Sequence, residues 1–141
     1  MFGWLKKGEQ YLEEAGEEPR DEVEQDDAPP GETENLLIIQ HLCLIAGISA
    51  EIIADAKEHG GVDAEMLQSE ADHYARLRAE AVQLADTITD EFYRGAAINF
   101  FIELCMKARE FKEARALFRH QDIKKFREKI VEKYPEIARV I

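Results

Sequence analysis

The apolar run from Leu36 to Ile48, LLIIQHLCLIAGI, constrains the fold of this chain more than any other stretch, because only two of its thirteen residues are strongly polar. Thirteen residues are too few to cross a bilayer as a helix, which takes about 20 apolar residues. We therefore interpret the run as the first half of a buried helix that continues to Ala56, where charged residues make the second half one-sided. A helix that is apolar all round at one end has neighbours on most sides there, either inside a bundle or at a subunit interface.

Three apolar residues of this helix are candidates for an interface. At 100° per residue, Leu37, Leu44 and Ile48 occupy the arc that carries the polar side chains of the same helix. His41 lies on this arc as well, inside the apolar run. We expect His41 to be buried and hydrogen-bonded, with a proton switch or a cofactor ligand as the alternative.

The rest of the chain predicts further helices, so the expected fold class is all-α, with a bundle of about five helices over residues 34–141 around the Leu36–Ala56 helix. Thr33 or Asn35 is expected to cap this central helix, and the glycine pair at 60 and 61 to end it.

Other helix boundaries follow from capping residues and glycines. Asp63 is expected to cap a second helix that runs to about Arg94, where Gly95 interrupts it. Asp122 is expected to cap the last helix and Pro135 to end it. Arg78 falls on the apolar stripe of the second helix, so we expect it to reach the edge of that stripe or to meet an acid such as Glu51 or Asp55.

One turn, near Lys107–Glu110, is predicted from periodicity alone, because the apolar residues before and after it would lie on opposite faces of a continuous helix. The stretch Ile98–Phe118 then resembles one helix-turn-helix unit of the tetratricopeptide type. In such a unit an aromatic residue, an alanine and a second aromatic residue pack the hairpin, here Phe111, Ala114 and Phe118. The resemblance implies a helical hairpin; it covers one unit, and the chain holds no second copy.

The first 15 residues, MFGWLKKGEQYLEEA, are predicted to form a short amphipathic docking motif. Its apolar candidates for contact are Phe2, Trp4, Leu5, Tyr11 and Leu12. Aromatic and aliphatic residues beside Lys6 and Lys7 suit a groove on a protein partner or a membrane interface. The alternative is a helix that packs back on its own domain.

Residues 16–33 are predicted to be a disordered acidic linker. The segment 16–35 contains nine acids against one arginine and a single large aliphatic residue, Val23. Like-charge repulsion and low hydrophobicity do not offset the entropy lost on ordering such a segment. A linker of this kind lets the motif at 1–15 bind at some distance from the domain at 34–141.

The residues that could carry chemistry are few. Glu70 and His73 have the Glu-x-x-His spacing of metal sites in four-helix bundles, but a di-metal site needs a second such pair, which the chain lacks. Cys43 and Cys105 are expected to be buried, reduced thiols. No nucleophile, phosphate-binding or catalytic motif is present, so we expect neither an enzyme nor a bound metal or cofactor.

Charge argues against nucleic acid as the partner, because the formal net charge is −12 and phosphates would repel most of the surface. Only the C-terminal segment, residues 107–141, is basic, with eleven bases against six acids. We expect a solvated helix face there. An alternative is that the acidic linker folds back on this basic region and masks it.

Together these features favour a non-enzymatic adaptor or assembly protein. Its helical domain would bind a protein partner or self-associate, and its N-terminal motif would dock to a second partner or a membrane surface. Lys6 and Lys7 stand beside no apolar run, so no secretory signal is expected and the expected location is cytoplasmic, with peripheral contact to the inner face of a membrane as an option. Two alternatives remain open: a metal-binding bundle that uses Glu70 and His73, and an acidic inhibitor that occupies a basic cleft or mimics nucleic acid.

Overall fold

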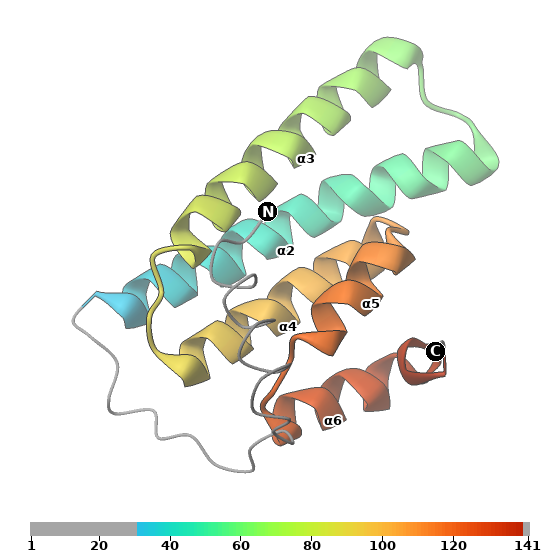
Figure 1. Ribbon diagram of the computed structural model, residues 1–141. Helices are drawn as coiled ribbons and strands as arrows, with labels where there is room; N and C mark the ends of the chain where they lie inside the picture. The colour runs from blue at the N-terminus through green and yellow to red at the C-terminus, as the bar shows by residue number, and fades with distance from the viewer. Residues whose placement is uncertain (1–30, 140–141) are drawn as a thin grey trace.

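The computed structural model describes residues 31–139, and these form an all-α bundle without strands, as the sequence predicts. Five α-helices are followed by one short 3-10 helix: α2 Glu32–His59, α3 Ala64–Ala85, α4 Glu91–Lys107, α5 Phe111–Arg119, α6 Lys124–Lys133 and η2 Pro135–Ala138. Helices α2 and α3 form a long antiparallel hairpin, and α4 packs against α2 (Figure 1). Helices α5 and α6 contact α4, and η2 contacts both of them.

Helix α2 begins earlier than the sequence predicts. Its N-cap is Gly31, with φ 87°, and no side chain caps it, so the predicted caps Thr33 and Asn35 are wrong. Glu32, in the first turn, is buried and instead accepts hydrogen bonds from Thr89 and Asp90, next to the start of α4. The predicted end of α2 is confirmed, because the helix ends at His59 and two glycines with positive φ follow it.

The boundary between α3 and α4 lies well before Gly95. Helix α3 ends at Ala85, and α4 begins at Glu91 after Asp90, whose side chain accepts a hydrogen bond from the Tyr93 amide at 3.0 Å. The prediction that Gly95 interrupts a helix is therefore wrong. Gly95 lies inside α4, where a Cβ atom would come within 2.5 Å of Ile123 Cδ1. The glycine is thus a site of close helix packing and not a turn.

The remaining boundaries agree with the sequence more closely. Asp63 caps α3 by accepting a hydrogen bond from the Met66 amide at 2.7 Å. The turn predicted from periodicity is confirmed, because α4 ends at Lys107 and α5 begins at Phe111. The N-cap position of α6 is Ile123, without a side-chain cap, so the prediction of Asp122 is wrong; α6 ends at Lys133, and Pro135 opens η2 two residues later.

The most buried helix is α4, and not α2 as the sequence predicts. Ten of its 17 residues are buried, among them Phe101, Ile102 and Leu104, which are at most 2% exposed. Helix α2 has nine buried residues among 28, and it contacts α3 and α4 with one side only. The other side of its apolar run therefore lies at the surface.

Candidate docking surface on helix α2

The exposed side of α2 carries a row of large aliphatic side chains, which we call the α2 stripe. Its members and their exposed fractions are Leu37 59%, Ile38 46%, Leu44 54%, Ile48 61% and Ile52 37%. At 100° per residue these five residues fall within an arc of about 120°. On the opposite side of the helix, Ile39, Leu42 and Ala46 are buried in the core. The helix is thus apolar on two sides, and the described part of the chain covers only one of them.

The size of the stripe is unusual for a surface that meets only water. The exposed fractions correspond to an apolar patch on the order of 500 Å², near the upper end of the range for the largest patch on a monomeric protein. Patches of this size commonly mark binding sites. At its C-terminal end the stripe reaches a hollow of about 590 Å³, lined by Ile48 and Ile52 of α2 together with Met106 and Tyr134.

Acidic residues surround this surface. Glu34 is exposed beside the first turn of the stripe, and Glu51 and Asp55, with side chains 62% and 76% exposed, stand at its other end. Two bases also line the hollow: Lys107 lies 4.0 Å from Glu51, and Arg109 lies 3.6 Å from Glu58. The surface is therefore an apolar row with exposed acids at both ends, and at its C-terminal end two bases lie beside the acids.

His41 lies on the same arc as the stripe and is exposed, so the prediction of a buried histidine is wrong. The reason is the same as for the stripe, because no other helix within residues 31–139 covers this side of α2. The structure places the predicted interface residues Leu37, Leu44 and Ile48 together in one row and adds Ile38 and Ile52 to them. The predicted contact residues Phe2, Trp4, Leu5, Tyr11 and Leu12, like the acidic linker up to residue 30, lie outside the described residues.

The Glu-x-x-His pair, Glu70 and His73, lies on α3, beside α2. His73 Nδ1 lies 3.0 Å from Ser49 Oγ, a hydrogen bond that joins α3 to α2. No third ligand from the described residues joins Glu70 and His73. Among the described residues, the potential metal-ligand atoms of Cys105, Glu110 and Glu113 lie within 4.8 Å of one another.

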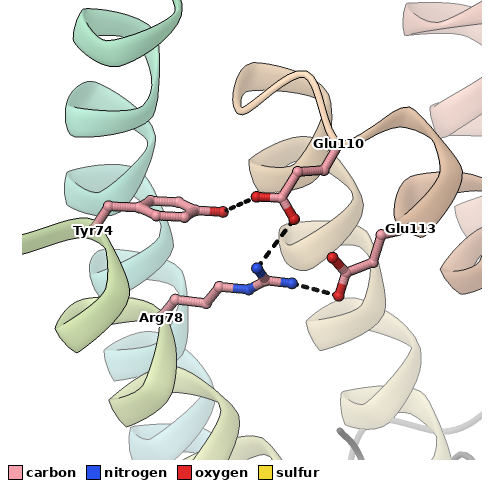
Figure 2. Close-up of polar contacts among 4 residues, drawn as sticks. All are labelled: Tyr74, Arg78, Glu110 and Glu113. Carbon is pink, nitrogen blue, oxygen red and sulfur yellow. Dashed lines mark hydrogen bonds and ion pairs between the residues drawn. The ribbon is translucent and has the colours of Figure 1, made fainter. Parts of the chain in front are cut away.

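This second group belongs to an ion-pair network that joins α3 to the start of α5 (Figure 2). Arg78 donates to Glu110 Oε2 at 3.1 Å and forms a short ion pair with Glu113, while the Tyr74 hydroxyl donates to Glu110 Oε1 at 2.9 Å. Arg78 therefore meets acids, as predicted, but these are Glu110 at the N-cap of α5 and Glu113 within α5, in place of the suggested Glu51 or Asp55.

Each charged group of this network has a partner of opposite charge. Burial raises the pKa of Glu110, helped by its nearness to Glu113, whereas hydrogen bonds from Glu110 and Arg78 outweigh burial and lower the pKa of Glu113. Burial also raises the pKa of Cys105 to about 12, so its thiol stays protonated and is a poor metal ligand. The network therefore holds α3 against α5, and we assign it no ligand.

The helical hairpin implied by the tetratricopeptide resemblance is present as α4 and α5. Ala114 and Phe118 are buried, but Phe111, the first aromatic residue of the pattern, is 40% exposed. Comparisons with protein-family models, curated proteins and solved structures find no match for this chain.

By length and composition alone, α2 also passes the test for a membrane-spanning helix, with an 18-residue window of mean hydropathy 2.0. Of that window, 39% is buried inside the bundle. A core helix of a water-soluble bundle passes the same test.

Proposed function

We propose that this protein is a non-enzymatic adaptor or assembly protein that docks a helix of a protein partner along the α2 stripe. The observation that supports this is the row from Leu37 to Ile52, which no other part of residues 31–139 covers and which is about 22 Å long at 1.5 Å per residue. An amphipathic helix of about 15 residues matches that length. Such a helix would contact the stripe through apolar residues spaced three and four positions apart.

The size and charge of the stripe favour a single helix over a second copy of this domain. A stable interface between two proteins buries about 800 Å² on each partner, whereas the stripe offers on the order of 500 Å². Antiparallel pairing of two copies of α2 would bring Glu34 of one copy near Asp55 of the other, at both ends. A partner helix with basic residues at its ends meets neither difficulty.

The N-terminal residues 1–15 provide a second docking point in this proposal. The aromatic and aliphatic residues of the motif, with Lys6 and Lys7 beside them, suit a protein groove or the surface of an anionic membrane. The acids around the α2 stripe disfavour anionic lipid as its partner, because like charges repel. We therefore assign the stripe to a protein and leave membrane contact to residues 1–15.

The test uses three forms of the full chain: the wild type, Leu44→Glu with Ile48→Glu, and the matched control Met66→Glu. Met66 is an apolar residue of α3 that is 56% exposed and lies outside the stripe. All three forms should unfold within about 0.5 kcal/mol of one another, because the changes are at the surface. Affinity capture from cells that produce the protein should recover the same partner with the wild type and the control, but not with the double variant.

Two results would contradict the proposal. One is capture of the same proteins by all three forms. The other is capture that weakens steeply with salt, because that would indicate an acidic surface that binds a basic cleft, whereas apolar docking is nearly insensitive to salt. Light scattering on the same samples gives the mass in solution, and a dimer of the wild type that the double variant lacks would assign the stripe to self-assembly.

A further inference from the structure

A second surface, distinct from the α2 stripe, lies between α4 and α6, and we call it the lysine groove. It is a hollow of about 580 Å³ with an apolar floor and a basic rim. The floor includes Phe92, Phe100, Phe126 and Ile130. The rim is a row of three exposed lysines at four-residue spacing on α6, namely Lys125, Lys129 and Lys133.

The positive charge of this rim is only partly neutralised. Lys133 forms an ion pair with Glu103 of α4. Lys125 and Lys129 have no carboxylate within ion-pair distance in the part of the chain that the structure describes, and the Lys125 ammonium lies 4.6 Å from the centre of the Phe92 ring. Two lysines beside an apolar floor suit a ligand that combines carboxylates with a few apolar side chains.

The described part of the chain begins next to one end of this groove. The Thr33 hydroxyl lies 2.9 Å from the Tyr93 hydroxyl, and Glu32 is held by Thr89 and Asp90. Tyr93 follows Phe92 in α4, and the two rings are 6.0 Å apart. The start of α2 is therefore fixed beside the Phe92 end of the groove.

The segment just before this point has complementary chemistry. Residues 16–30 contain seven acids and one arginine, together with Val23, Pro29 and Pro30. Lys125 and Lys133 are eight residues apart on a helix, about 12 Å, and four extended residues span that distance. Fifteen residues are thus long enough to enter the groove from its Phe92 end and follow the whole rim.

We propose that residues 16–30 of this chain bind in the lysine groove, with carboxylates of Asp21–Asp27 on Lys125 and Lys129 and apolar side chains on the aromatic floor. The tether gives these residues an effective concentration in the millimolar range, so contacts that are weak one by one are sufficient. An acidic partner of the groove must then displace this segment. The inference does not depend on the function proposed for the α2 stripe.

The test places a nitroxide label on the full chain at Gln25→Cys and measures the broadening of amide resonances in the domain. Cys43 and Cys105 are buried, and burial raises the pKa of each to about 12, so the label reacts with the new cysteine only. At about 0.1 M salt the amides of α6 around Lys125 and Lys129 should broaden, and at about 1 M salt the effect should fall about twofold or more as the charges are screened.

Two further variants of the labelled chain make the test specific. Lys125→Gln with Lys129→Gln should abolish the broadening of α6, whereas Lys112→Gln, which removes an exposed lysine of α5 outside the groove, should leave it unchanged. Absence of broadening at α6, or equal broadening in both variants, would overturn the inference. Broadening along α2 instead of α6 would also overturn it, and would place the segment on the α2 stripe.

Discussion

Replacing Gly95 with alanine should destabilise the domain, although alanine is the better helix former. In the interior of an exposed helix the change gains about 1 kcal/mol. At Gly95 the new Cβ atom would lie 2.5 Å from Ile123 Cδ1 and 2.9 Å from Phe126 Cδ2, and both neighbours are buried in the contact between α4 and α6. Overpacking of this kind costs about 1–3 kcal/mol. The displacement also strains the hydrogen bond of 2.7 Å from Gln121 to the Gly95 carbonyl, which is worth about 1 kcal/mol.

The expected net loss is therefore about 1–3 kcal/mol, measured as a lower midpoint of urea unfolding with an unchanged slope. Gly47→Ala is the matched control, because Gly47 is also buried inside a helix but its Cβ atom would meet only the flexible side chain of Lys107, at 3.0 Å. Lys107 can move away, so this variant should be as stable as the wild type or more stable by about 0.5–1 kcal/mol. A Gly95→Ala protein as stable as the Gly47→Ala protein would refute the packing argument.

Three further predictions concern groups that the fold buries. Burial alone would raise the pKa of Glu32, but hydrogen bonds from Thr89 and Asp90 outweigh burial and lower this pKa. The ionised carboxylate therefore stabilises the fold above its ordinary pKa of about 4.3, and this stabilisation is lost as the pH falls below that value. Glu32→Gln should therefore cost about 1–2 kcal/mol at pH 7 and progressively less towards pH 3, which urea unfolding across that pH range measures. Arg78→Met should cost about 2–3 kcal/mol in the same assay, because it leaves the partly buried Glu110 and Glu113 without their cation. A loss below about 0.5 kcal/mol, the usual range for surface changes, would contradict this. Cys43 and Cys105 should react with a thiol reagent at pH 8 at least about 100 times more slowly in the native than in the unfolded protein, and fast reaction of the native protein would show that the core opens there.

The sequence predicts the helices of this fold better than their contacts. The turn at Lys107–Glu110 follows from a switch of apolar face, because one continuous helix would need two separate cores. The end of α3 could also have been found, since Asp90 followed by Glu91 is a helix-start signal. Gly95 misled the prediction because a glycine serves a turn and a close helix contact equally well, and only the position of α6 decides between them.

The candidate site shows the same limit. The sequence places Leu37, Leu44 and Ile48 on the polar arc of their helix, and this placement alone marks them as residues that the domain leaves uncovered. The sequence did not distinguish a helix surrounded by neighbours from a helix covered on a single side. His41 is exposed because α2 is of the second kind. The partners of Arg78 come from α5, more than 30 residues away, and no local pattern identifies them.

The most direct test of the α2 stripe is a photo-crosslink from its centre. A benzophenone amino acid in place of Ile48, in the full chain and in cells that produce it, should yield a discrete adduct of higher mass that contains a second polypeptide. The same amino acid in place of Met66, which is about as exposed but lies on α3, should not yield that adduct. If Ile48 yields no protein adduct, or if both positions yield the same mixture, the α2 stripe is not a docking surface.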